Sequence, residues 1–168
     1  QVIGLCYAGL GAGTITASLY GNRVSARVGP GPCLVVGFAL CGLGWLLPWL
    51  WPAGPAGVAA FVAMLMLGGT GGVLIFINFL AMRQAVTPAP LLGRMTATMR
   101  WLILLPAVPG ALLGGWIGEH QGLTHTLGAA GALALLLAVL AWRSAAIRQV
   151  RVLPVATDLP PVDQAEAA

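Results

Sequence analysis

Long apolar runs, separated by short polar stretches, dominate the pattern of this chain. They occupy residues 2–20, 33–51, 57–82, 101–118 and 123–142. Each is close to the roughly 20 residues that a helix needs to cross a hydrocarbon core about 30 Å thick. The apolar residues are continuous rather than alternating with a period of two, which argues against a transmembrane β-barrel. Because lipid offers no hydrogen bonds to the backbone, the runs are predicted to be five membrane-spanning helices.

The polar stretches differ in charge in a regular way. All eight basic residues are arginines. Arg23 and Arg27 separate the first two runs, three arginines lie at 83–100 between the third and fourth, and three follow the fifth. Consecutive helices cross in opposite directions, so this alternation places every arginine on one side of the membrane. Positive charge is retained in the cytoplasm, which predicts an outside start and a cytoplasmic C-terminus.

Composition supports a membrane protein. Apolar residues make up 59% of the chain and charged residues 7%, against about 25% charged residues in a soluble domain. The net charge of +4 does not indicate a nucleic-acid partner, because no lysine-rich or aromatic-interleaved basic face exists. The predicted fold class is therefore an all-α membrane protein. A partial transmembrane bundle would span residues 1–145, and a disordered cytoplasmic tail, with three prolines and three acids, residues 146–168.

Residues that could act in catalysis or bind a metal are too scattered along the chain to predict an active site. The three cysteines match no zinc spacing and are odd in number, which favours small packing residues over disulfides or metal ligands. His120 and His125 lie near Glu119 but lack a metal-binding spacing, so we interpret them as polar caps on a short loop. No Ser-His-Asp or Cys-His group can be assembled at one depth. We expect no enzyme activity, no metal and no cofactor.

Small residues and prolines recur inside the apolar runs. Glycine-rich segments are predicted to let helices pack closely, as glycines four apart do at Gly110 and Gly114. These segments lie at residues 9–13, 68–72, 110–115 and 128–132. Prolines at 48, 106 and 109 predict local kinks.

A few polar side chains also lie within the runs. Thr14 and Thr70 can bond back to their own helices, which favours a structural role. Asn78 is harder to bury in lipid and is expected to face a cavity or a neighbouring helix. These three residues are the candidates for a substrate pathway. The runs contain no carboxylate. If an ion gradient drives transport, the acid that carries the proton would have to belong to a part of the transporter outside these runs.

The stretch "RQAVTPAPLLGRMTATMR" resembles the cytoplasmic link between the tenth and eleventh helices of major facilitator superfamily transporters. The likeness is closest to drug, macrolide and siderophore exporters with the pattern "R…TPxxLxGRxxAxxR". Its positions are occupied by Arg83, Thr87, Pro88, Leu91, Gly93, Arg94, Ala97 and Arg100. The stretch "NRVSARVGPGP", which begins beside Arg23, is similar to a degenerate "G-x-x-x-D-R-x-G-R-R" signature. Arg27 and Gly29 match it, whereas Ala26 replaces the acid.

This resemblance implies a secondary active transporter that works by alternating access. The five runs would correspond to helices 8–12 of a twelve-helix fold, so the chain would lack an N-terminal half and one further helix. The implied substrate is a small amphipathic molecule, exported across a bacterial inner membrane. An uptake permease of the same fold remains an alternative. So does a non-transporting remnant or membrane interaction protein, because five helices cannot enclose a two-halved pathway alone.

Overall fold

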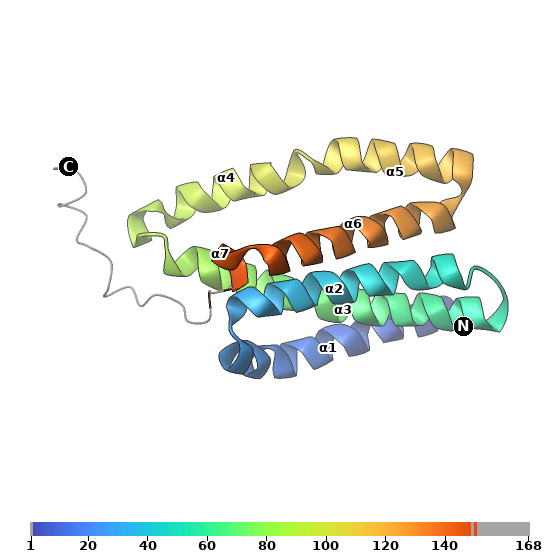
Figure 1. Cartoon of the computed structure of the whole chain (residues 1–168), viewed down its shortest axis with the longest axis horizontal. Helices are drawn as coiled ribbons and strands as arrows, with labels where there is room; N and C mark the ends of the chain where they lie inside the picture. Colours follow the sequence, from blue (N-terminus) through green and yellow to red (C-terminus); the bar gives the residue numbers. More distant parts are fainter. Residues whose placement is uncertain (1, 149, 151–168) are drawn as a thin grey trace.

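The computed structural model describes residues 2–148 and 150, and within them the chain is helical with no β-strand (Figure 1). In chain order the elements are α1 (Val2–Val28), α2 (Pro30–Leu50), α3 (Gly54–Ala85), the 3-10 turn η1 (Ala89–Leu91), α4 (Leu92–Leu104), α5 (Ala107–Gln121), α6 (Leu123–Arg143) and α7 (Ala145–Arg148). Among these residues, 5 helical segments are long and apolar enough to cross a membrane, with α4 and α5 together forming the fourth. The prediction of an all-α, five-span membrane protein is confirmed.

The helices extend further than the apolar runs. α1 has 27 residues and continues to Val28, so Arg23 and Arg27 lie on a helix and not in the predicted loop. α3 has 32 residues and continues past Arg83. At 1.5 Å per residue these helices measure roughly 40 and 48 Å, well beyond a hydrocarbon core of about 30 Å. The apolar pattern marks the part within lipid, whereas the hydrogen-bonded helix continues beyond it.

A single residue, Gly29, separates α1 from α2. Its φ is 98°, a conformation that glycine adopts without steric penalty because it has no Cβ. α2 begins directly afterwards with Pro30, whose missing N–H is harmless in the first turn of a helix. The turn can therefore be this short.

Proline also interrupts the fourth span, as predicted. α4 ends at Leu104 and α5 begins at Ala107, with Pro106 between them. The Pro106 ring cannot donate a backbone hydrogen bond and crowds the preceding turn, which ends the helix. Pro109 lies in the first turn of α5, and α2 continues through Pro48 to Leu50. Only Pro106 therefore coincides with a break in the helix.

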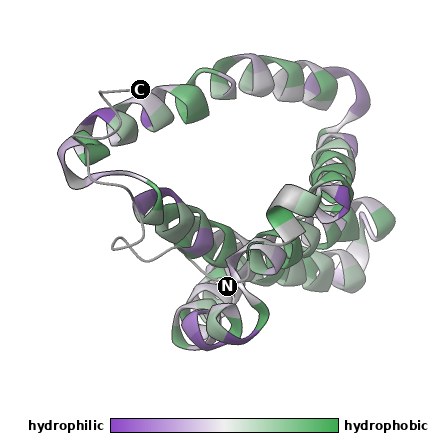
Figure 2. Ribbon diagram, turned by 60° about the vertical axis from the view of Figure 1, so that its left-hand side comes forward, coloured by the Kyte–Doolittle hydropathy of each residue, from purple (hydrophilic) through white to green (hydrophobic). Residues whose placement is uncertain are grey.

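Four of the long helices pack as one bundle. α2 lies between α3 and α6, and α1 packs against the far side of α3 (Figure 1). Large apolar side chains cover the outside of the bundle, for example Leu136 at 53% exposure and Val139 at 54%. Figure 2 shows hydrophobic residues on the outward surfaces of the helices as well as between them. This distribution suits a lipid environment, in which outward apolar groups carry no penalty.

Glycines form the contacts within this bundle. The buried residues Gly9, Gly13, Ala17 and Gly21 recur at every fourth position of α1, and the glycines among them contact α3. α2 carries glycines on two faces, one towards α3 and one towards α6. An added Cβ at residue 37 would lie 2.6 Å from Ile75 Cγ1 of α3, and one at residue 42 would lie 2.9 Å from the Gly131 carbonyl oxygen of α6. An added Cβ at Gly69 would lie 3.0 Å from the Leu10 carbonyl oxygen of α1, whereas one at Gly72 would meet nothing within 4 Å. Close packing in the segments 9–13, 68–72 and 128–132 is therefore confirmed for the glycines that face a neighbouring helix.

The fourth span stands apart from the bundle. The membrane-length window within Leu92–Gln121 has 0% of its residues buried. α5 packs against α6 near their shared turn, whereas the main contacts of α4 are with its chain neighbours η1 and α5 (Figures 1 and 2). An added Cβ at Gly110 would meet nothing within 4 Å, and one at Gly114 would meet only Thr126 Cγ2, at 3.7 Å. The prediction of tight helix packing at residues 110–115 is wrong here, because only Gly114 lies near another helix, α6, and the contact leaves room for a Cβ.

The segment after α6 folds back over the start of α2. α7 is helical from Ala145 to Arg148, so the predicted disordered tail from residue 146 begins too early. The Gly31 N–H donates to the Val150 carbonyl oxygen at 3.1 Å. Residues 151–168, which make up most of that tail, lie outside the described residues.

Candidate functional site

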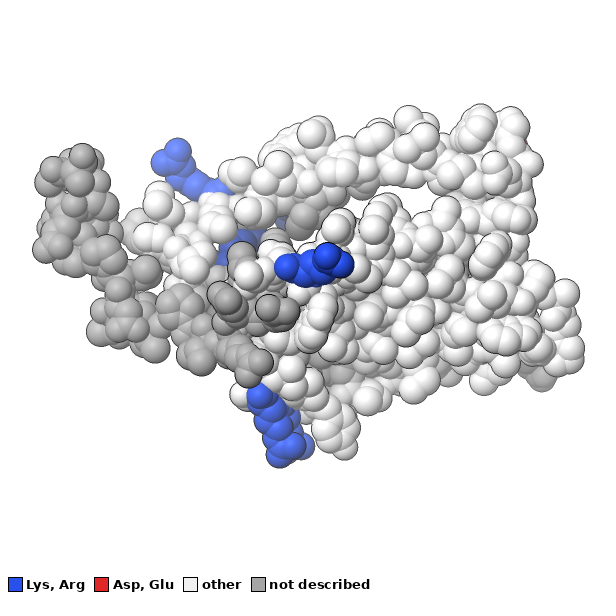
Figure 3. Space-filling view, in the orientation of Figure 1, with Lys and Arg blue, Asp and Glu red and all other residues white. Residues whose placement is uncertain are grey.

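The arginines of α1, α3, α4 and α6 gather at one end of the bundle. The ends of α1, α3 and α6 and the start of α4 all lie there (Figure 1), and Figure 3 shows the basic side chains confined to that end of the visible face. Glu119, the one acidic residue among those described, lies near the opposite end, in the last turn of α5. This placement agrees with the alternation of charged and uncharged stretches in the sequence.

The segment from residue 83 to 100 forms an ordered turn between α3 and α4. The Thr87 hydroxyl donates to the Arg83 carbonyl oxygen at 2.8 Å and lies 2.6 Å from Met95 Sδ. The Arg83 guanidinium carbon lies 6.0 Å from the centroid of the Phe79 ring. The Leu91 N–H donates to the Pro88 carbonyl oxygen at 3.0 Å. Thr87 and Pro88 of the motif thus close the turn that joins the two helices.

The remaining motif residues lie on α4. Gly93, Arg94 and Arg100 are all exposed, and an added Cβ at Gly93 would meet nothing within 4 Å. Arg94 borders a cavity of about 520 Å³ between the turn and the first turns of α4, lined also by Thr87 and Met95. The Arg94 side chain is therefore accessible from outside the bundle.

A buried polar contact joins the arginine-bearing end of α1, near Arg23 and Arg27, to α3. Asn78 of α3 is 1% exposed. Its side-chain oxygen accepts a hydrogen bond from the Ser25 hydroxyl of α1, and its Nδ2 donates to the Leu74 carbonyl oxygen at 2.8 Å. Asn78 faces a neighbouring helix, which was one of the two predicted environments.

Ser25 was missed from the sequence because its stretch was interpreted as a loop. A signal was nevertheless present. Ser25 continues the stripe of small residues that recurs every four positions at Gly13, Ala17 and Gly21. A polar residue in such a stripe faces the same neighbouring helix as the glycines before it.

The other two candidate pathway residues, Thr14 and Thr70, lie where α1 packs against α3, further along these helices from Ser25 and Asn78. The Thr14 hydroxyl donates to the Gly11 carbonyl oxygen at 2.9 Å. The Thr70 hydroxyl donates to the Met66 carbonyl oxygen at 2.9 Å and lies 3.2 Å from the Gly13 carbonyl oxygen of α1. Thr70 therefore contributes to the contact between the two helices. Transport roles for Thr14, Thr70 and Asn78 stay predictions.

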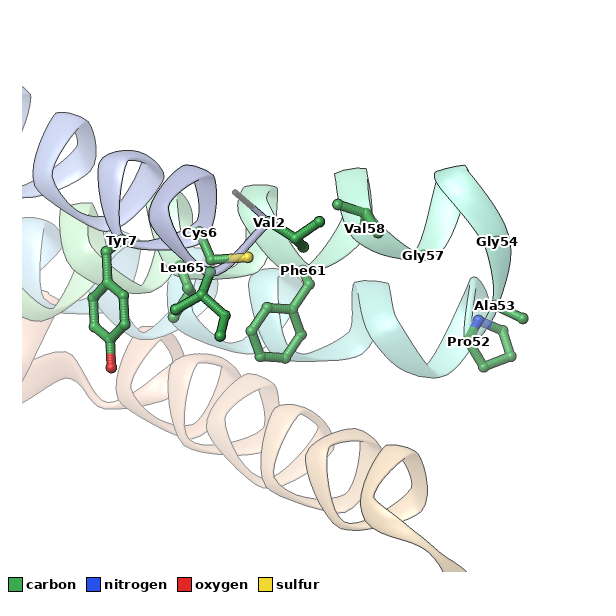
Figure 4. A pocket seen from close by; sticks show the side chains of 11 residues that line it. Val2, Cys6, Tyr7, Pro52, Ala53, Gly54, Gly57, Val58, Phe61 and Leu65 are labelled. Atoms are coloured by element: carbon green, nitrogen blue, oxygen red, sulfur yellow. The ribbon is translucent and has the colours of Figure 1, made fainter.

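The arginine-free end contains an apolar cavity of about 640 Å³ between the start of α1 and the α2–α3 turn. Figure 4 shows the side chains that line it, including Cys6, Tyr7, Phe61 and Leu65. None of the described residues that line the cavity carries a charge. Its chemistry suits an apolar occupant such as an acyl chain, and no sequence motif indicated it.

The two histidines lie on either side of the α5–α6 turn. His120 Nδ1 lies 2.8 Å from the Trp116 carbonyl oxygen, and its ring centroid lies 4.8 Å from that of Trp116. His125 is exposed in the first turn of α6. They are terminal helix residues and not parts of a loop, because the turn itself is Gly122 alone, with φ 95°.

Comparison of the chain with models of known protein families, with curated proteins and with solved structures finds no match. The fold defines an all-helical, multi-pass membrane protein. Within that class, its distinguishing features are the buried Ser25–Asn78 contact and the arginine-bearing end.

Proposed function

We propose that this chain is part of a secondary active transporter that exports a small amphipathic molecule by alternating access. The observation that carries the proposal is the segment at residues 83–100. Its pattern resembles the link between the tenth and eleventh helices of major facilitator exporters. It forms a hydrogen-bonded turn between two membrane-length segments, at the end where the arginines gather.

The separation of the fourth span supports this proposal. A transporter of this kind needs a polar or amphipathic path between two helical halves. The α4–α5 layer has no buried residue, and Figure 3 shows an opening between it and the helices below. In the proposed assembly a second helical half completes this side, and α4–α5 forms part of the wall of the path.

The proposed orientation follows from the arginines. Their end faces the cytoplasm of a bacterial cell, with the C-terminus inside, because basic residues are retained on that side during insertion. The described spans contain no ionisable acid apart from Glu119 near the end of α5. The acid that carries the coupling proton is therefore proposed to belong to the second half.

Arg94→Gln tests the proposal. Arg94 is exposed, so its replacement should leave insertion intact while slowing dye efflux severalfold in energised cells that express the whole gene. Arg143→Gln, at the exposed end of α6, removes the same charge and should have little effect. Membrane yield is measured by immunoblot, and a protonophore should abolish the efflux. Unchanged efflux in Arg94→Gln contradicts the role of the motif, and efflux that is independent of the gene contradicts export.

Two alternatives give different results in the same assay. An uptake permease of this fold would increase dye accumulation on expression. A membrane interaction protein would leave accumulation unchanged, with and without the protonophore. The second alternative is favoured by the exposed faces of α4–α5, which would suit contact with a partner helix.

A further inference from the structure

The last two turns of α1 present a small groove to the surroundings. It has a volume of about 280 Å³ and is lined by Tyr20, Arg23, Val24 and Arg27. These residues follow one another by three, one and three positions, which places them on one face of a helix. All four are exposed, Tyr20 at 54% and Val24 at 40%.

The contact between Ser25 and Asn78 fixes the direction of this face. Arg23 and Arg27 lie two positions before and after Ser25, or about 200° away around a helix with 3.6 residues per turn. Ser25 is hydrogen-bonded to Asn78 of α3. Gly21 also faces α3, since an added Cβ there would lie 3.3 Å from Leu74 Cδ2. The two guanidinium groups therefore point away from the bundle.

The groove also lies at a defined depth. With a rise of 1.5 Å per residue, a hydrocarbon core of about 30 Å that begins near Val2 ends near residue 22. Arg23 and Arg27 then lie about 2–8 Å beyond it, at the level of lipid headgroups. Tyr20 lies at the boundary, where tyrosine rings are enriched in membrane proteins.

The charge of the groove has no internal partner among the described residues. Their one acid, Glu119, lies near the opposite end of the structure. A guanidinium group presents several N–H donors in a fixed plane that matches the oxygens of a phosphate. A groove of about 280 Å³ suits a headgroup and is smaller than one turn of a partner helix, which is about 10 Å wide and about 5.4 Å long.

We propose that this face binds the phosphate of an anionic phospholipid such as phosphatidylglycerol. The Arg23 and Arg27 guanidinium groups, one helical turn apart, donate hydrogen bonds to the phosphate oxygens. The Tyr20 ring and the Val24 side chain contact the glycerol and the upper part of an acyl chain. The site does not depend on the proposed transport function, because it needs only the membrane depth and orientation of α1.

Native mass spectrometry of the full chain in mixed micelles tests the site. The wild-type chain should retain phosphatidylglycerol in preference to phosphatidylcholine. The double variant Arg23→Gln/Arg27→Gln should lower this preference by at least about tenfold, because the charge-assisted hydrogen bonds that both arginines donate to one phosphate are lost together. The matched control is Arg94→Gln/Arg100→Gln, which removes the same charge from exposed positions that do not share a helical face. It should change the preference by less than about threefold, because separated exposed charges are screened.

A second measurement uses the unaltered chain, so it does not depend on how the variants fold. Photoreactive phosphatidylglycerol should cross-link to the peptide that contains Tyr20 and Arg27, and excess soluble glycerol phosphate should not displace it. Equal losses in the two double variants would show diffuse attraction without a site. Cross-linking elsewhere, or displacement by glycerol phosphate, would overturn the assignment to a lipid.

Discussion

Gly13→Ala should destabilise the bundle although alanine favours helices. An added Cβ at residue 13 would overlap the Met66 carbonyl oxygen and lie 2.9 Å from the Met66 carbonyl carbon. Both atoms belong to the backbone of α3, so a change of rotamer cannot relieve the overlap and the helices must separate. Overpacking of this kind typically costs about 1–3 kcal/mol, and helix propensity returns up to about 1 kcal/mol. Because the overlap is with backbone atoms, we expect a cost of about 2–3 kcal/mol, in the upper part of this range, and therefore a net loss of about 1–2 kcal/mol.

Gly11→Ala is the matched control in the same helix, because an added Cβ there would meet nothing within 4 Å. It should be neutral or slightly stabilising, since only helix propensity changes. Unfolding can be followed with a fluorogenic maleimide, because Cys33 is 1% exposed and Cys6 is 8% exposed in the folded chain. Gly13→Ala should lower the midpoint temperature by about 2–8 °C. Equal midpoints for the two variants would refute the argument from packing.

Two further predictions concern the polar contact and the topology. In a double-mutant cycle, the losses in unfolding free energy caused by Ser25→Ala and Asn78→Leu should be non-additive by about 0.5–1.5 kcal/mol, as expected for a hydrogen bond between membrane helices. Additive losses would show that the contact contributes nothing to stability. In a chain without its native cysteines, Arg94→Cys should resist an impermeant maleimide added to intact cells, whereas Gln121→Cys should react. Labelling at residue 94 would contradict the proposed orientation.

The packing of this protein explains why it contains so many glycines. In water, large apolar side chains drive helices together, but in lipid they are equally well solvated on the outside of the bundle. Close approach of backbones then provides the attraction, and it requires small residues at the contacts. Gly42 and Gly131 show this directly, since an added Cβ at either would lie 2.9 Å from the carbonyl oxygen of the other.

Parts of the candidate site could be predicted, and other parts could not. The turn at residues 83–100 was found because its arginines and prolines stand out against apolar neighbours. Asn78 was found because a buried amide in lipid requires a partner. Its partner Ser25 was missed, since α1 continues beyond the apolar run and the stripe of small residues that extends to Ser25 was not followed past residue 21. The groove beside Arg23 depends on that same extension of the helix.

The sequence by itself determined the helical class, the approximate positions of the spans and the shared end of the arginines. These properties follow from penalties that act on each segment separately, namely unsatisfied backbone groups and charges in lipid. The tertiary structure decided which helices meet. Residues 9–13 and 110–115 are similarly rich in glycine, yet Gly13 contacts α3 closely whereas Gly110 faces open space. Contacts between distant segments depend on the shapes of both partners, which no single stretch of sequence specifies.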